Sequence, residues 1–276
     1  MMKHGWLHGF SPRTRARARL FCFGHAGGSA AVFRKWADLL PADVEMLAVQ
    51  LPGRGGRLSE PVVDSIPALV ERLLPALEPH LDRPYALFGH SMGAVLASEV
   101  ARRLDDGTGA GPRHLFVSGR RPAHVASGES LLHALSDAQF VVEINRRYGG
   151  IPHEVAQHRD LLELLLPSLR ADIKALETFA PAPGRRALAY PLTAFGGATD
   201  PLVPRDHLDA WRDVTAGAFR VRVFDGGHFY LDAQARDLVA DLGTTLVAAL
   251  ANSDPTGAAS AAPISALAEP ICAERT

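Results

Sequence analysis

The sequence has little of several features that mark large classes of protein. Only two of its 276 residues are cysteines, Cys22 in an apolar run and Cys272 near the end, which argues against a structural disulfide and a CxxC metal or redox site. The formal net charge is −1, so no basic field favours nucleic acid or acidic lipid. No apolar run is long enough to span a bilayer, and the N-terminus lacks a signal-peptide core. We expect a cytoplasmic protein that binds neither nucleic acid nor membrane.

Short apolar runs alternate with amphipathic stretches along most of the chain. Such runs are typical of strands covered on both faces of a sheet, and the amphipathic stretches are typical of the helices that cover them. The alternation predicts right-handed βαβ crossovers and a mostly parallel, doubly wound sheet of the α/β class. The expected strands are residues 20–23, 45–51, 85–88, 114–118, 192–195 and 219–224, and the expected helices are residues 31–40, 66–81, 94–104 and 205–214.

The alternation is interrupted once, by a stretch that predicts only helices. Residues 129–150 and 153–180 have helical patterns and stand between the fourth and fifth expected strands. A helical insertion at the carboxyl edge of an α/β sheet lies where ligands bind, so it is a candidate lid. Two helices that only thicken the core would give the same pattern. Two roles therefore fit the side chains of Leu135, Phe140 and Ile144: they line a pocket under the lid, or they only pack the helices together.

The length and composition predict one main domain. We expect it over residues 1–250, with a core at 19–120 and 187–250 and the helical lid insertion at about 121–186. Residues 251–276 are rich in alanine, serine and proline and show no sustained periodicity. That composition predicts a disordered C-terminal tail.

The stretch FGHSMGA contains the pattern G-x-S-x-G at Gly89, Ser91 and Gly93. An expected strand precedes it and an expected helix follows it, which is the context of the sharp turn that exposes a nucleophilic serine in α/β hydrolases. Serine is also a favoured helix N-cap, and on that interpretation the turn has no catalytic meaning. The choice depends on whether a histidine and a carboxylate stand where such a serine needs them.

The base for such a serine is predicted by position along the chain. In this type of sheet the order is serine, acid, histidine, each at the carboxyl end of a strand. His228 directly follows the last expected strand, in VFDGGHFYL, where two glycines let the loop turn inward. The other histidines after Ser91 begin a strand, lie in the helical insertion, or stand in a loop or at a helix start: His114, His124, His133, His153, His158 and His207.

The acid is predicted in the same way. Asp200 lies a few residues past the penultimate expected strand, in LTAFGGATDPLVP. A capping or turn aspartate would occupy the same kind of place. Asp225 and Asp232 are nearer to His228 in sequence, but neighbours on one loop point poorly at each other's rings. Asp200 is the first candidate and Asp225 the reserve.

The loop after the first expected strand reads GHAGGSA and predicts an oxyanion hole. Backbone N–H groups from this loop and from the residue after the nucleophile hold the oxyanion in hydrolases of this type, which selects Ala26 and Met92. A glycine-rich turn also suits a dinucleotide, but the spacing fails G-x-G-x-x-G, and the next strand has no acidic residue at its end. The Walker pattern fails as well, because no Gly-Lys-Ser/Thr follows.

With these residues assembled, the chain resembles a type II thioesterase, the editing hydrolase associated with nonribosomal peptide and polyketide synthases. The resemblance runs from about residue 20 to residue 250, and its segments are FGHAGGSAAVFRKWADLL, VQLPGRGGRLSEP, FGHSMGA, LRADIKALETF, FGGATDPLV and FDGGHFYL. It implies the α/β-hydrolase fold, with Ser91 as nucleophile, Asp200 as acid, His228 as base and the Ala26 and Met92 amides as oxyanion donors. Gly24 departs from the family, which usually has proline there.

The resemblance also implies the substrate and the partner. The substrates are acyl groups held as thioesters on the phosphopantetheine arm of carrier protein domains, and hydrolysis removes stalled or aberrant chains. No metal or organic cofactor is expected, and we expect a monomer. Four arginines are candidates for docking an acidic carrier domain, with solvated side chains or internal salt bridges as the equal alternative: Arg54, Arg57, Arg120 and Arg121.

Two other functions fit parts of the same pattern. A carboxylesterase or an acyltransferase uses the same three side chains on an oxygen ester or with an alcohol or amine acceptor. A catalytically silent binding protein of the same fold usually lacks a member of the triad, whereas this sequence has a candidate at each position.

Overall fold

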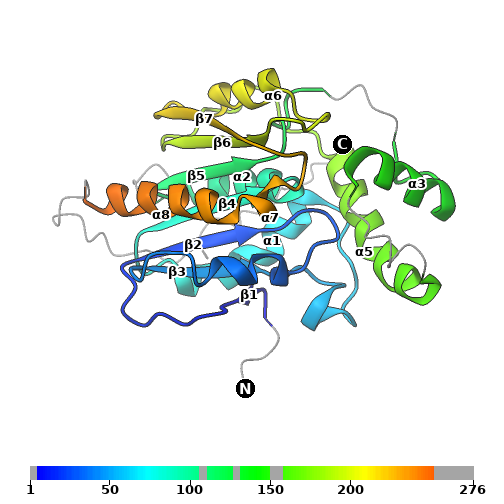
Figure 1. The fold of residues 1–276 in the computed structure, drawn as a ribbon, viewed down its shortest axis with the longest axis horizontal. Coiled ribbons are helices and arrows are strands. Elements are labelled where there is room, and N and C mark those ends of the chain that lie inside the picture. The colour runs from blue at the N-terminus through cyan, green and yellow to red at the C-terminus, as the bar shows by residue number, and fades with distance from the viewer. Residues whose placement is uncertain (1–4, 106–110, 127–130, 150–157, 252–276) are drawn as a thin grey trace, which may run out of the picture.

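The computed structural model describes residues 5–105, 111–126, 131–149 and 158–251 (Figure 1). The described residues form one seven-stranded sheet in the order β1-β3-β2-β4-β5-β6-β7, in which β1 pairs antiparallel with β3 and all other neighbours are parallel. The predicted mostly parallel sheet is confirmed. The strands are β1 (Leu7–His8), β2 (Ala18–Phe23), β3 (Val44–Val49), β4 (Tyr85–His90), β5 (His114–Ser118), β6 (Leu192–Gly197) and β7 (Phe219–Phe224).

The strand order reverses direction at β2, which has β3 on one side and β4 on the other. In open α/β sheets such a reversal leaves a crevice at the carboxyl ends of the strands, because the connections diverge to opposite faces. Phe23 at the end of β2 pairs with Gly89 near the end of β4. The two loops that carry the predicted oxyanion donors therefore start side by side.

Helices cover both faces of the sheet (Figure 1). One apolar cluster packs α1 and α2 against one face, and a second packs η1 and α8 against the other. The α-helices of this core are α1 (Ile66–Leu77), α2 (Met92–Leu104), α6 (Arg205–Asp209), α7 (Tyr230–Ala233) and α8 (Ala235–Ala251). The 3₁₀ helices are η1 (Ala30–Trp36), η2 (Gly55–Arg57), η3 (Glu78–His80) and η4 (Ala210–Val214).

The first predicted helix, over residues 31–40, is a shorter 3₁₀ helix in the structure. Phe33 and Trp36 are three residues apart, and their rings both pack edge-on against Phe88 of β4. A helix with three residues per turn places such a pair on the same face. Aromatic packing on the sheet thus accounts for the tighter helix. The two-residue strand β1 was not predicted, because two residues show no periodicity.

The helical insertion lies beside the sheet, with α3 (Asp137–Tyr148) and α5 (Arg159–Thr178) next to each other in Figure 1. Ser136 and Gln139 form a capping box that starts α3. Phe140 and Ile144 of α3 pack against Ile173 of α5 in a separate apolar cluster. Parts of the expected insertion, 127–130 and 150–157, and nearly all of the expected tail lie outside the described residues. The division into core, lid and tail stays a prediction.

Candidate active site

Ser91 stands on a strained turn between β4 and α2. Its backbone has φ 55° and ψ −114°, and it is the one non-glycine residue with positive φ in the described part of the chain. The flanking glycines have no room for a side chain, since a Cβ on Gly89 would lie 2.0 Å from the Gly93 carbonyl oxygen and one on Gly93 would lie 2.1 Å from that of Phe23. The Ser91 side chain makes no N-cap hydrogen bond to the helix it precedes. The geometry is that of a nucleophile elbow and not of a cap.

The structure brings Ser91, His228 and Asp200 into one hydrogen-bonded row. His228 Nε2 lies 3.1 Å from Ser91 Oγ, and His228 Nδ1 lies 2.7 Å from Asp200 Oδ2. The second carboxylate oxygen of Asp200 accepts from the Leu202 N–H at 3.0 Å, which fixes the rotation of the carboxylate. All three side chains are buried. A serine held by a histidine that is itself held by a carboxylate is the arrangement that acyl transfer requires.

The other candidates for the acid and the base lie elsewhere. Asp225 and Asp232 are exposed, and neither has a hydrogen bond to His228. His133 is tied to Glu177 in the insertion, 2.6 Å from its carboxylate, and His207 contacts the Leu202 carbonyl. His114 contacts the Thr193 hydroxyl at 2.9 Å, and burial lowers its pKa to about 4. His153 lies outside the described residues.

The two expected oxyanion donors are present with their N–H groups unused. Within the described part of the chain, neither the Ala26 nor the Met92 amide donates to a protein acceptor. Met92 is the first residue of α2, and Ala26 lines the same cavity as Ser91. Free amides at a helix start and in an adjoining loop provide the donors that a developing oxyanion needs.

Two further histidines surround the row, and the sequence interpretation gave them no role. His90 lies behind Ser91, with Nδ1 2.8 Å from Ser118 Oγ and Nε2 without a partner among the described residues. Burial lowers the pKa of His90 well below the usual value, and the nearby His228 lowers it further. His25 lies in the oxyanion loop, where burial lowers its pKa as well. Both shifts favour the neutral imidazole, so neither ring favours a positive charge beside His228.

An apolar cavity of about 260 Å³ opens above Ser91 and His228. Its walls come mainly from one face of α5, so the stripe of leucines in the insertion points at the reactive side chains. Ile144 lines this cavity, whereas Phe140 only packs between the helices and Leu135 borders a different groove. The cavity, which we call the apolar lobe, is lined by His25, Ala26, Gly27, Ser91, Ile144, Tyr148, Leu162, Leu165, Leu166, Leu169, Ile173, Leu176, His228 and Phe229.

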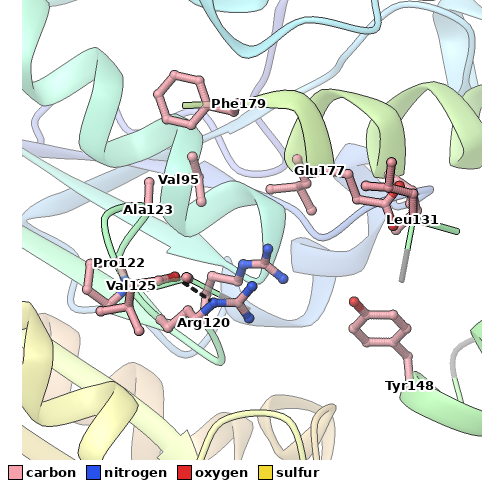
Figure 2. Close-up of a pocket in the computed structure, with 13 residues that line it drawn as sticks. Val95, Arg120, Pro122, Ala123, Val125, Leu131, Tyr148, Glu177 and Phe179 are labelled. Atoms are coloured by element: carbon pink, nitrogen blue, oxygen red, sulfur yellow. Dashed lines mark hydrogen bonds between the residues drawn. The ribbon is translucent and has the colours of Figure 1, made fainter. Parts of the chain in front are cut away.

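A second cavity of about 210 Å³ adjoins the first, and we call it the polar lobe. Both lobes are lined by Tyr148, Ile173 and Leu176, and the Tyr148 ring lies 5.3 Å from the His228 ring. Figure 2 shows the Arg120 guanidinium and the Tyr148 hydroxyl directed into the space between these two side chains. Arg121 also lines the lobe and donates to the Val125 carbonyl at 3.0 Å.

Glu177 borders the polar lobe, but other groups already satisfy its carboxylate. Oε1 accepts from the Leu132 N–H at 2.7 Å, and Oε2 accepts from the His133 N–H at 3.0 Å and faces His133 Nδ1 at 2.6 Å. The carboxylate is therefore turned toward the start of the insertion. The lobe offers cationic and hydroxyl groups beside the apolar wall, a surface suited to polar ligand atoms.

Three of the four arginines considered for docking are buried: Arg54, Arg57 and Arg121. Arg54 is 3% exposed and pairs with Asp172 of α5, and Arg57 is 7% exposed and pairs with Glu60. Neither guanidinium is available to a partner surface, so the internal salt-bridge alternative holds for both. Asp172 had no assigned role in the sequence. The signal that could have identified Asp172 is a charged residue within the inward-facing apolar stripe of α5.

The described residues contain no group of three His, Cys, Asp or Glu side chains placed to hold a metal ion. None of the described helices has the length and apolarity needed to cross a membrane.

Cys22 is a free, buried thiol in the sheet, and burial raises its pKa well above the usual value.

Comparisons with known proteins agree on one family. A family model described as "Thioesterase domain" matches residues 18–246. The protein named Thioesterase PikA5, from Streptomyces venezuelae, is 40% identical over 243 residues, covering 88% of this chain and 85% of that protein. The protein named Linear gramicidin dehydrogenase LgrE, from Brevibacillus parabrevis, is 39% identical over 246 residues, covering 87% and 92%. The solved structure of the type II thioesterase BorB from the borrelidin biosynthetic cluster superposes with a TM-score of 0.79 at 35% identity, covering 87% and 97%.

Proposed function

The chain belongs to the thioesterase family, and we propose that it uses Ser91, His228 and Asp200 to hydrolyse acyl groups from the phosphopantetheine arm of carrier proteins. The observation that carries the proposal is the hydrogen-bonded row of these side chains at the floor of an apolar cavity. The resemblance to type II thioesterases noted in the sequence is confirmed by the family match and by relatives of the same kind.

The first half of the reaction makes an acyl-enzyme. Ser91 Oγ attacks the thioester carbonyl carbon while its proton passes to His228 Nε2, and Asp200 stabilises the imidazolium through Nδ1. The Ala26 and Met92 amides donate to the oxyanion of the tetrahedral intermediate. The carbon–sulfur bond then breaks, His228 returns the proton to the leaving sulfur, and the pantetheine thiol departs.

The second half regenerates the enzyme. A water molecule gives a proton to His228 Nε2 and attacks the carbonyl carbon of the acyl-serine ester. The ester bond breaks, the proton passes to Ser91 Oγ, and a carboxylic acid leaves. These steps require no metal ion or organic cofactor, because the histidine handles every proton and the amides hold the charge.

The two lobes support a division of the substrate. The apolar lobe suits a hydrocarbon acyl chain, since leucines of α5 form its wall. The polar lobe suits the pantetheine arm, whose amides and phosphate pair with guanidinium and hydroxyl groups. The arm enters past Arg120 and Tyr148, and the thioester carbon reaches Ser91 where the lobes join.

The partner and the setting follow from the relatives as proposals. PikA5 is named a thioesterase, and BorB is named a type II thioesterase from the borrelidin biosynthetic cluster. We propose carrier domains of a polyketide or nonribosomal peptide synthase as partners, with removal of stalled or aberrant acyl groups as the outcome. A cytoplasmic location and a monomeric state remain predictions.

The name of the LgrE relative raises a dehydrogenase as the alternative. The loop after β2 argues against a dinucleotide in this chain. Its Gly27 N–H already donates to the Asp172 carboxylate at 2.7 Å, and a pyrophosphate there would meet that negative charge. Just after β3, the Gln50 side chain accepts a hydrogen bond from the Ala30 N–H through Oε1 and donates one to the Arg54 carbonyl through Nε2. No carboxylate is left there for a ribose.

The test compares acyl groups on a carrier protein with the same groups on free pantetheine and with matched oxygen esters. Ser91→Ala is expected to lower kcat by about 10⁶-fold without unfolding the protein. Ser98→Ala, a buried serine of α2 outside both lobes, is the control and should keep full activity. Undiminished turnover by Ser91→Ala would contradict the mechanism. A strong preference for oxygen esters would favour a carboxylesterase.

A further inference from the structure

A buried ion pair ties the insertion to the core and takes no part in the proton transfers of the reaction. Arg54 lies in the loop after β3, and Asp172 lies in α5 with no exposed surface. Arg54 Nη2 donates to Asp172 Oδ1 at 2.9 Å, and Nη1 donates to Oδ2. Burying two charges is costly unless further hydrogen bonds satisfy the remaining lone pairs. The partners of Asp172 are therefore informative.

The third donor to Asp172 is a backbone amide of the oxyanion loop. The Gly27 N–H donates to Asp172 Oδ2 at 2.7 Å. Gly27 has φ +74° at the third position of a turn closed by the Gly28 N–H and the His25 carbonyl, 3.0 Å apart. The Ala26 carbonyl in the same turn lies 3.0 Å from His25 Nδ1. The peptide group between Ala26 and Gly27 is thus held at both its oxygen and its nitrogen.

The far end of the same loop is held from the loop that contains Arg54. Gln50 Oε1 accepts from the Ala30 N–H at 3.0 Å, and Gln50 Nε2 donates to the Arg54 carbonyl at 3.0 Å. The oxyanion loop therefore has one anchor at Gly27 and another at Ala30, and both lead to Arg54. A donor must be held to within about 0.5 Å of its productive position to stabilise a transition state.

We propose that Asp172 and Arg54 are positioning residues that hold the Ala26 amide toward the oxyanion, so that α5 sets the oxyanion hole as well as the wall of the apolar lobe. The proposal rests on the roles proposed for Ser91 and the Ala26 amide. Asp172 acts through the Gly27 N–H and touches no substrate. Without its acceptor, the peptide between Ala26 and Gly27 is held only at its oxygen, and the direction of the preceding amide is less tightly fixed.

The test uses Asp172→Asn and Asp172→Ala with the full-length enzyme and an acyl-pantetheine substrate. The asparagine keeps one oxygen for the Gly27 N–H, whereas the alanine keeps none. We expect kcat to fall by about 10-fold for Asp172→Asn and about 100-fold for Asp172→Ala, with KM within about 3-fold of wild type. Affinity for an alkylboronic acid, which forms a tetrahedral adduct on a serine, should fall in parallel with kcat.

Glu60→Gln is the matched control. Glu60 pairs with Arg57 through two hydrogen bonds of 2.8 and 2.6 Å in the same loop as Arg54, and Arg57 donates to the Gln50 backbone carbonyl at 2.9 Å and not to Asp172. This variant should keep both kcat and boronate affinity. Melting temperature is measured for every variant, because loss of a buried acceptor also lowers stability.

The outcomes separate this proposal from the proposed function. If wild type hydrolyses the substrate and Asp172→Asn lowers only the melting temperature, with kcat and boronate affinity within 2-fold of wild type, Asp172 is structural and the proposal is overturned. If Asp172→Ala does not fold, Asp172→Asn and Arg54→Lys decide by the same measurements. A wild-type enzyme that does not hydrolyse acyl-pantetheine contradicts the proposed function itself. Parallel losses of kcat and boronate affinity support the positioning role.

Discussion

The sheet core and the helical insertion contribute to the site in different ways. The core supplies the three reacting side chains from loops after β4, β6 and β7; β4 and β6 are buried strands, whereas β7 is buried only at its last residue. The insertion supplies the leucines of α5 and the Tyr148 ring, which shape the space above them. Chemistry is thus separated from substrate shape except at Asp172 of α5, which contacts the oxyanion loop. Changes among the reacting side chains of the core should alter the rate for every substrate, and changes among the lobe-lining residues of the insertion should alter which substrate is preferred.

After the loss of Ser91 itself, the largest expected effect lies in the core, at Asp200. Asp200→Asn removes the carboxylate that holds the His228 tautomer, and kcat should fall by about 10⁴-fold for all acyl chain lengths alike. Asp225→Asn is the control, since Asp225 is exposed and makes no contact with His228. The measurement is kcat over a series of acyl-pantetheine thioesters. A loss confined to long chains would break the proposed separation.

A smaller and selective effect is expected in the insertion, at Leu166. Leu166→Trp fills part of the apolar lobe, so kcat/KM for an octanoyl thioester should fall by about 10-fold while the value for acetyl changes by less than about 2-fold. Leu164→Trp places the same ring on α5 at a residue that is 48% exposed and outside the lobe, and it should change neither value. Equal losses for both chains in Leu166→Trp would contradict the assignment of the lobe.

The polar lobe provides the next test, through the thiol part of the substrate. Arg120→Ala should lower kcat/KM by about 5-fold for acyl groups on pantetheine phosphate and leave N-acetylcysteamine thioesters unchanged, since the short handle does not reach the guanidinium. Arg103→Ala removes an exposed arginine of α2 outside both lobes and serves as the control. The same loss with both handles would show that Arg120 acts on the acyl side or on folding.

The smallest effect on activity is expected at His114, a core residue remote from the insertion. Burial lowers its pKa to about 4 in the folded state. Below about pH 6.5 the unfolded chain takes up a proton that the folded protein does not, so the free energy of unfolding falls by up to about 1.4 kcal/mol per pH unit. His114→Gln should reduce this slope between pH 6 and pH 4.5, as measured by urea unfolding, and keep kcat at pH 7. If His114→Gln leaves the pH dependence of the free energy of unfolding unchanged, the lowered pKa of His114 is contradicted.

The core was largely predictable because its signals are local. All six expected strands are present within a few residues of their predicted ends, and Ser91, Asp200 and His228 each follow one of them. The structure brings these side chains into hydrogen-bond contact, although their catalytic roles stay predictions. Strand ends can be located from sequence because a buried apolar run stops where a loop begins.

The insertion was less predictable because its important contacts are distant in sequence. Arg54 and Asp172 are 118 residues apart, and no periodicity links a loop arginine to an aspartate on a later helix. The same limit applies to Tyr148 at the end of α3, whose ring meets His228 across 80 positions of sequence. Leu135, Phe140 and Ile144 share one helical pattern, yet only Ile144 lines the apolar lobe, because burial on a helix face does not distinguish a wall from a packing contact.

The central claim is that Ser91 receives the acyl group from a carrier-bound thioester. The direct measurement is rapid quenching of the enzyme with an acyl carrier protein, followed by protein digestion and mass spectrometry. We predict a transient acyl adduct on the peptide containing Ser91, which forms as the free carrier thiol appears and is absent from Ser91→Ala. Release of the thiol at an undiminished rate by Ser91→Ala, or an adduct on another residue, would contradict the account.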